Sequence, residues 1–129
     1  DTPLLTTKTL KGLVTFHEDN NADLTVMTTE FENPYGYGRI LRNAKDEVIK
    51  IVEEKDASES VKEIKEVNTG VYCLNWAKMK NSFNEMRNNN VQGEYYLTDI
   101  VKWARDNQHV VLGYTAKDNK EIYLRTLLF

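Results

Sequence analysis

The chain has 129 residues, a mass of 15.0 kDa and a formal net charge of −3. Its length is enough for one domain with a core of its own. Hydrophobic residues make up 40% and charged residues 29%, which is typical of a globular protein and not of a disordered chain. The mean hydropathy is −0.59, and no apolar run approaches the ~20 residues that a membrane-spanning helix requires. The acidic pI of about 5.4 argues against a nucleic-acid-binding protein. A single cysteine, Cys73, excludes an internal disulfide, and without an evident signal peptide we expect a reducing cytoplasm.

The first part of the chain predicts one helix and then three strands. Apolar residues at helical spacing, preceded by Thr6 or Thr7 as a cap, predict a helix over 6–20. The segments that we expect to be strands are 23–29, 38–42 and 47–53. Residues 43–46 are typical of a hairpin connection between the last two of these strands.

The second part of the chain predicts helices that alternate with strands. The expected helices are a short polar helix or turn over 58–65 and amphipathic helices over 75–87 and 97–107. The expected strands cover 67–74 and 110–115. Alternating helices and strands with one hairpin between them predict an α/β domain with a mixed sheet and flanking helices.

Several kinds of catalytic or metal site are disfavoured by the sequence. His17 and His109 lie far apart without neighbouring ligands, which disfavours zinc. Cys73 falls within a predicted strand and is interpreted as a buried, inert thiol. Gly36 and Gly38 lack the third glycine and the following helix of a phosphate-binding loop.

Glu53 is the first candidate binding residue. Strand alternation puts its carboxylate on the same face as Ile49 and Ile51, where partial desolvation would favour a ligand with hydroxyl donors. The alternative is that Glu53 only begins the charged run over 53–56, and composition alone favours this alternative.

A second group of candidates follows further along the chain. Asn68 offers two donors and one acceptor, which suit a hydroxyl or acetamido group. Gly70 within a strand indicates a bulge or the close approach of a ligand or another backbone, and the alternative is a simple kink. The segment 92–99 contains Tyr96 and Thr98, and it forms either a pocket wall or a helix-capping segment in which Thr98 or Asp99 caps.

These segments together resemble one family. The similarity covers about residues 1–122, and the segments that carry it are 1–5 (DTPLL), 35–40 (YGYGRI), 52–57 (VEEKDA), 66–72 (EVNTGVY) and 88–99 (NNNVQGEYYLTD). In this order they resemble the uridylyltransferase domain of the bacterial bifunctional N-acetylglucosamine-1-phosphate uridylyltransferase / glucosamine-1-phosphate acetyltransferase. The last two segments are fairly specific among sugar-nucleotide pyrophosphorylases.

The resemblance implies a fold and a reaction. The fold is the C-terminal part of a Rossmann-like, glycosyltransferase-A-like nucleotide-diphospho-sugar transferase fold. In the reaction, N-acetylglucosamine 1-phosphate attacks the α-phosphorus of UTP, and UDP-N-acetylglucosamine and pyrophosphate are formed with Mg²⁺ as the cofactor. The family uses no covalent nucleophile, so catalysis depends on positioning and on neutralising phosphate charge. The parent enzyme would serve peptidoglycan and lipopolysaccharide precursor synthesis.

The resemblance also assigns roles to individual residues. Asp1 matches an aspartate that holds Mg²⁺, and Gly38 matches a glycine whose backbone contacts the sugar. Glu53 and Asn68 match a pair that hydrogen-bonds the N-acetylglucosamine moiety. Tyr96 and Thr98, the remaining matched positions, line the sugar pocket in the family.

Other parts of the family pattern are missing from the sequence. The glycine-rich G-x-G-T-R-M segment with its lysine, the G-x-N-[DN]-R segment that supplies a second metal ligand, and the acetyltransferase domain are absent. We therefore expect residues 1–122 to be the sugar-binding part of a truncated enzyme, inactive alone, and 123–129 to be a divergent tail. The resemblance leaves open an oligomer formed through the missing domains. Two alternatives remain: a related glucose-1-phosphate nucleotidylyltransferase, and a non-catalytic sugar-nucleotide-binding or interaction module.

Overall fold

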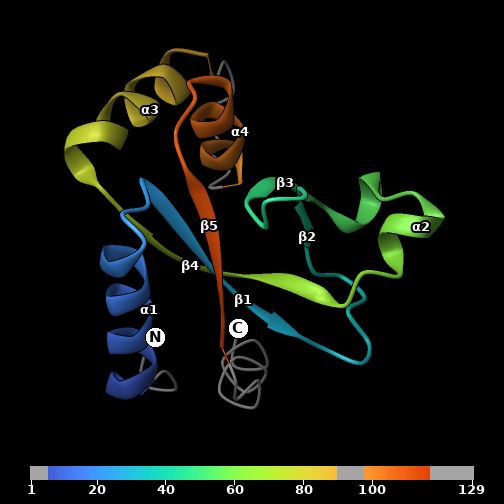
Figure 1. Cartoon of the computed structure of the whole chain (residues 1–129). Helices are drawn as coiled ribbons and strands as arrows, with labels where there is room; N and C mark the ends of the chain where they lie inside the picture. The colour runs from blue at the N-terminus through green and yellow to red at the C-terminus, as the bar shows by residue number, and fades with distance from the viewer. Residues whose placement is uncertain (1–5, 90–97, 117–129) are drawn as a thin grey trace.

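The computed structural model describes residues 6–89 and 98–116, and they form an α/β domain (Figure 1). The helices are α1 (Thr7–Asp19), the 3-10 turn η1 (Glu54–Asp56), α2 (Glu59–Lys62), α3 (Trp76–Asn89) and α4 (Asp99–Asp106). The strands are β1 (Leu24–Glu30), β2 (Arg39–Arg42), β3 (Val48–Val52), β4 (Glu66–Leu74) and β5 (Val111–Thr115). All the predicted helices and strands are confirmed, with ends that differ by a few residues.

The five strands form one mixed sheet in the order β3-β2-β4-β1-β5. β1 lies antiparallel to β4 and parallel to β5, and β2 lies antiparallel to β3. The hairpin between β2 and β3 joins the rest of the sheet at one register pair, Arg39 opposite Val67. The predicted mixed sheet with flanking helices is therefore confirmed.

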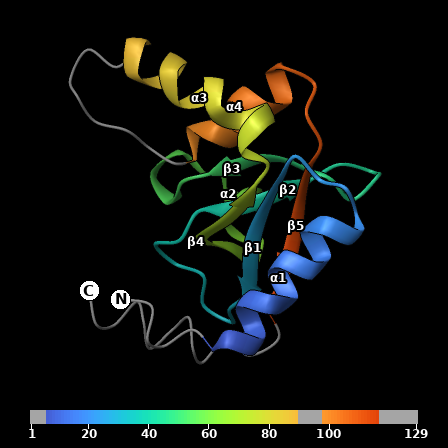
Figure 2. The same ribbon diagram turned by 90° about the vertical axis from the view of Figure 1, so that its left-hand side faces the viewer.

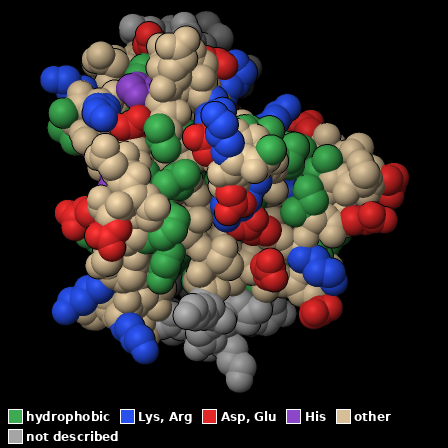
Figure 3. All heavy atoms as spheres, viewed as in Figure 1, with side chains coloured by type: hydrophobic (Ala, Val, Ile, Leu, Met, Phe, Trp, Pro, Cys, Tyr) green, Lys and Arg blue, Asp and Glu red, His purple; other side chains and the backbone are tan. Residues whose placement is uncertain are grey.

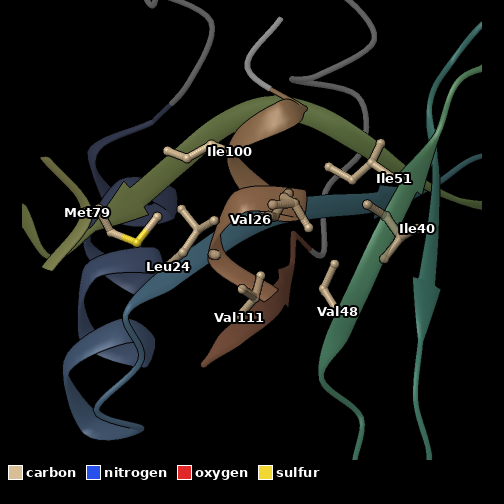
Figure 4. Close-up of a cluster of buried hydrophobic side chains, with 10 residues drawn as sticks. Leu24, Val26, Ile40, Val48, Ile51, Met79, Ile100 and Val111 are labelled. Atoms are coloured by element: carbon tan, nitrogen blue, oxygen red, sulfur yellow. The ribbon is translucent and has the colours of Figure 1, made fainter. Parts of the chain in front are cut away.

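Helices cover the sheet on both faces. Leu24 and Val26 of β1 contribute to a core cluster beneath α3 and α4, while Met27 contributes to a second cluster beneath α1. Figure 2 shows α1 alongside the sheet and α3 with α4 at another side, and Figure 4 shows the first cluster. Alternation along β1 thus gives a strand that is buried on both faces, as expected for a central strand.

Local sequence signals explain where the elements begin and turn. The Thr6 hydroxyl accepts a hydrogen bond from the Thr9 backbone N–H and caps α1. Ser58 caps α2 in the same way. The predicted hairpin turn is closed by the Asn43 N–H, which donates to the Glu47 carbonyl at 3.0 Å.

β3 departs from simple alternation. The pairing with β2 shifts register between Leu41 and Arg42, so that Val48 lies opposite Arg42 and Lys50 lies opposite Leu41. Val48 is therefore buried with Ile51, whereas Ile49 is 37% exposed. The expectation that Ile49 and Ile51 share a face is wrong, because the irregular pairing leaves Ile49 outside the regular ladder.

β4 contains an irregularity at Gly70. Val26 pairs with Tyr72 and Thr28 pairs with Asn68, so three residues of β4 lie opposite one residue of β1. Gly70 has a φ of +84°, which a residue with a side chain rarely adopts. The predicted interruption of the strand at this glycine is confirmed as a bulge.

A half-buried ion pair at the start of β4 ties four strands together. The Arg42 guanidinium donates to both carboxylate oxygens of Glu66, at 3.0 and 2.6 Å. The Thr28 hydroxyl donates to the same carboxylate at 2.6 Å, and the Thr115 hydroxyl lies 3.3 Å away. Burial raises the pKa of Glu66, but the hydrogen bonds from Arg42 and Thr28 outweigh it and hold the pKa below the ordinary value of 4.5.

This network predicts an acid-sensitive contribution to stability. The pKa of Glu66 is lower in the folded chain than in the unfolded chain. The stabilisation by the Glu66 carboxylate is therefore complete at a pH above its pKa in the unfolded chain, and it is lost as the pH falls through its pKa in the folded chain. We expect Glu66→Gln to lower the free energy of unfolding at pH 7 by about 1–3 kcal/mol, with a smaller difference from the unsubstituted chain at pH 3. Urea unfolding at the two pH values measures this. Glu32→Gln is the control because the Glu32 side chain is 98% exposed. A loss of stability in Glu66→Gln that is equal at both pH values would contradict the prediction.

Within residues 6–89 and 98–116, no helix combines the length and apolar character needed to span a bilayer.

Candidate functional site

The sequence-predicted site residues lie at the ends of strands or beside them. Gly38 immediately precedes β2, Glu53 immediately follows β3, and Asn68 lies within β4 next to the bulge. Thr98 directly precedes α4. The other two predicted site residues, Asp1 and Tyr96, lie outside the described residues.

Gly38, Glu53 and Asn68 form one cluster. A Cβ added to Gly38 would lie 3.4 Å from each carboxylate oxygen of Glu53 and 2.9 Å from Cγ2 of Ile51. The Asn68 backbone N–H donates to the Gly38 carbonyl at 2.8 Å. Three residues that are far apart in the sequence are therefore neighbours, because the beginning of β2 pairs with β4 next to Asn68.

Tyr72 completes the cluster, and nothing in the sequence singled it out. The Asn68 side-chain amide donates to the Tyr72 hydroxyl at 3.1 Å. Burial raises the pKa of this hydroxyl, the hydrogen bond from Asn68 lowers it, and the nearby negative charge of Glu53 raises it further. Four residues thus meet beside the bulge. They provide a carboxylate, an amide and a phenol, together with a glycine that leaves space beside the carboxylate.

A groove of about 850 Å³ runs beside this cluster. Glu53 lines it at one side and Thr98 with Asp99 at another, and the other residues of its wall are Tyr35, Gly36, Glu54, Lys55, Asp56 and Lys62. Acidic side chains, red in Figure 3, gather on the side of the molecule that carries α2. The volume is sufficient for a ligand of small-molecule size.

Thr98 belongs to this groove and does not cap α4. It occupies the N-cap position, but its backbone is already helical, with φ −63° and ψ −23°, and its side chain makes no capping hydrogen bond. Of the alternatives predicted for the segment 92–99, capping by Thr98 is therefore not observed. The cap requires an extended backbone that points the side chain towards the first turn.

Arg39 is a second residue that the sequence did not single out. Its side chain is 3% exposed and donates to the Glu54 carboxylate at 2.6 Å. It also donates to the backbone carbonyls of Tyr37, at 2.7 Å, and Lys62, at 3.2 Å. One guanidinium therefore holds together three segments of the groove wall, namely the loop before β2, η1 and α2.

Glu54 is held in the same arrangement. Its carboxylate accepts from Arg39 and from the Gly36 backbone N–H, which lies 3.2 Å away. The hydrogen bond from Arg39 is the main cause that lowers the pKa of Glu54, and the one from Gly36 adds to it. Of the two adjacent glutamates, Glu54 is therefore committed to the wall, whereas Glu53 faces Gly38.

The two histidines and the cysteine do not line the groove. The described residues contain no group of three or more His, Cys, Asp or Glu side chains placed to hold a metal ion. His17 is buried with Nδ1 2.7 Å from the Thr25 hydroxyl, and burial lowers its pKa. Cys73 is half-buried, so the expectation of a buried thiol is wrong, although the burial that it has raises its pKa.

Comparison with known proteins defines the family. The Nucleotidyl transferase family model matches residues 4–120. Over 121 residues, or 94% of the chain, the sequence is 48% identical to the Bifunctional protein GlmU of Streptococcus sanguinis and equally identical to that of Brevibacillus brevis. Identity to the protein of that name from Caldanaerobacter subterraneus is 46% over 122 residues.

The chain spans only 26% of the length of these relatives. The match nevertheless covers all the described strands and helices, including the cluster and the groove. It also confirms the resemblance and the fold that were predicted from the sequence. The chain belongs to the nucleotidyl transferase family.

Proposed function

We propose that this chain forms the sugar-phosphate-binding part of a nucleotidyltransferase that makes UDP-N-acetylglucosamine and pyrophosphate from UTP and N-acetylglucosamine 1-phosphate. The observation that carries the proposal is the cluster of Gly38, Glu53 and Asn68, because the resemblance assigns contacts with the sugar to these three residues. The 48% identity to Bifunctional protein GlmU from Streptococcus sanguinis supports it. We also propose a cytoplasmic location, where UTP is available, and residues 1–122 as the functional part.

The chemistry of the cluster suits a sugar ring. The Glu53 carboxylate accepts hydrogen bonds from hydroxyl groups, and the Asn68 amide can both donate to and accept from an acetamido group. Gly38 leaves room for the ring beside the carboxylate, since any side chain there would contact Glu53. Thr98 offers a further hydroxyl at the groove.

The proposed reaction needs positioning more than it needs a nucleophilic side chain. A phosphate oxygen of the sugar phosphate forms a bond to the α-phosphorus of UTP, and the bond to the β-phosphate breaks to release pyrophosphate. The role of this chain would be to hold the attacking phosphate by fixing the sugar.

Mg²⁺ is part of the proposal, with Asp1 as the residue that would hold it. An aspartate carboxylate is the hard oxygen ligand that this ion prefers, and the bound ion would neutralise phosphate charge. Asp1 lies outside the described residues, and the described residues contain no cluster of metal ligands.

Calorimetric titration of the 129-residue chain with N-acetylglucosamine 1-phosphate tests the proposal. We expect Glu53→Ala to weaken binding by about 10- to 100-fold, the loss of a charge-assisted hydrogen bond, and Asn68→Ala by about 5-fold. Matched controls are Glu32→Ala and Asn84→Ala, because both residues are exposed and lie outside the cluster. Unchanged dissociation constants in both site variants would overturn the assignment.

Two further measurements separate the alternatives. Stronger binding of glucose 1-phosphate than of the N-acetylated sugar would favour a glucose-1-phosphate nucleotidylyltransferase. A hybrid in which residues 1–122 replace the matching segment of the Streptococcus sanguinis relative tests for catalysis through pyrophosphate release. A folded hybrid without release would favour a non-catalytic binding module.

A further inference from the structure

Tyr72 occupies a defined place in the cluster. It lies on β4 opposite Val26 and packs against the core cluster beneath α3 and α4. Its hydroxyl accepts a hydrogen bond from Nδ2 of Asn68 at 3.1 Å. The ring is thus held by the core while its hydroxyl reaches the binding cluster.

The bulge fixes which way the Asn68 amide points. The Gly70 backbone N–H can only donate, and it lies 2.9 Å from Oδ1 of Asn68, so the atom facing it must be the oxygen. Nδ2 then necessarily faces the Tyr72 hydroxyl. The amide is held from both sides, by the backbone of Gly70 and by the side chain of Tyr72.

We propose that Tyr72 is a positioning residue that fixes the Asn68 carboxamide for recognition of the acetamido group of the sugar. The inference rests on the function proposed above. Tyr72 is neither among the residues to which the resemblance assigns a role nor among those of the groove wall.

Counting the hydrogen-bonding capacity of Asn68 supports this role. An asparagine amide has two donor hydrogens and an oxygen with two lone pairs. Tyr72 takes one hydrogen and Gly70 takes one lone pair. One donor and one acceptor remain on the same planar group, which is the complement of the carbonyl and N–H of an acetamido group.

Loss of the Tyr72 hydroxyl would weaken the preference for the N-acetylated sugar over glucose 1-phosphate. Without it, Nδ2 of Asn68 loses its partner on one side, and the amide can rotate about its terminal bond, which has a broad torsional preference. An acetamido ligand would then have to order the amide on binding. Glucose 1-phosphate makes no such demand, because it carries a hydroxyl where the N-acetylated sugar carries the amide.

The test compares Tyr72→Phe with Tyr114→Phe in the 129-residue chain. Both substitutions remove one phenolic hydroxyl from a partly buried ring, but Tyr114 packs in the cluster beneath α1. Calorimetric titrations with N-acetylglucosamine 1-phosphate and with glucose 1-phosphate give two dissociation constants for each variant. We expect Tyr72→Phe to weaken binding of the N-acetylated sugar by about 3- to 10-fold and to leave binding of the other sugar within 2-fold. Tyr114→Phe should change neither.

The outcomes distinguish the two proposals. A chain that binds neither sugar phosphate, or in which Glu53→Ala and Asn68→Ala both leave binding unchanged, overturns the proposed function and this inference with it. An effect of Glu53→Ala without any effect of Asn68→Ala overturns only the role of Tyr72, which acts through Asn68. A chain that prefers the N-acetylated sugar, and keeps the full preference in Tyr72→Phe, overturns only the role of Tyr72. Equal weakening for both sugars also overturns it, because that result indicates a general packing effect. Thermal unfolding of each variant confirms that the compared chains are folded.

Discussion

Replacing Arg39 by alanine is expected to lower the free energy of unfolding by about 2–4 kcal/mol, the sum expected for a buried cavity and for buried acceptors that lose their donor. The Arg39 side chain is almost fully buried and donates to two backbone carbonyls in addition to the Glu54 carboxylate. In the alanine variant these acceptors stay in place without a donor. Chemical denaturation with urea measures the change.

Two further variants show whether the loss of stability in Arg39→Ala comes from the hydrogen bonds of the guanidinium group. Arg39→Lys keeps the charge but cannot reproduce a forked donor that reaches three acceptors, so we expect it to recover only part of the lost stability. Lys50→Ala removes a cation from an exposed position on β3 and should change stability by no more than about 0.5 kcal/mol. An alanine variant of Arg39 as stable as the Lys50 variant would show that the guanidinium does not hold the groove wall together.

The same substitution should also weaken ligand binding. The segments joined by Arg39 carry Gly36 and Glu54, which line the groove beside Glu53. Once released, these segments would have to be ordered again when a ligand binds. A sugar-phosphate affinity that stays unchanged in Arg39→Ala would separate the stability of the wall from its role in binding.

The arrangement of helices and strands could be predicted well because each segment carries its own signal. Helical spacing in α1 and α4, β-branched residues in β1, and the turn residues of the 43–46 hairpin are local features. These features indicate whether a segment is a helix or a strand independently of the neighbouring segments. The mixed sheet was predicted from the order of helices and strands along the chain.

Helical spacing was a less accurate guide to which side chains of a helix are buried. Val14 of α1 and Trp76 of α3 share the spacing of buried residues, yet they are 44% and 62% exposed. Periodicity places a residue on a face of its helix, but how far that face is covered depends on the sheet beneath it. Trp76 lies instead against Phe83, with ring centroids 5.7 Å apart.

The candidate site was predictable only in part. Glu53 and Asn68 were named from residue type and resemblance, but their proximity depends on how the β2–β3 hairpin meets β4, and no local signal encodes that. Tyr72 joins them because the bulge at Gly70 brings a residue four positions along β4 back to the amide of Asn68. Arg39 was hidden for a different reason: sequence patterns treat arginine as an exposed residue, whereas here three acceptors make its burial favourable.

Gly38 provides the sharpest test of the geometry of the cluster. A methyl group at this position would lie 2.9 Å from Cγ2 of the buried Ile51 and 3.4 Å from each carboxylate oxygen of Glu53. We expect Gly38→Ala to lower the free energy of unfolding by about 1–3 kcal/mol through overpacking. We also expect about 10-fold weaker binding of N-acetylglucosamine 1-phosphate, because the methyl group would fill the space beside the Glu53 carboxylate that we assign to the sugar.

A second substitution separates these two effects of Gly38→Ala. Ile51→Leu removes the branched γ carbon that the new methyl group would meet, so the double variant should recover stability. The affinity of the double variant should remain low, because the methyl group still fills the space beside the Glu53 carboxylate. Gly12→Ala is the matched control, since its added methyl group would meet the Tyr114 hydroxyl beneath α1, away from the cluster. If Gly12→Ala and Gly38→Ala reduce sugar-phosphate affinity equally, the loss reflects general destabilisation, and the backbone of Gly38 has no specific place beside the sugar.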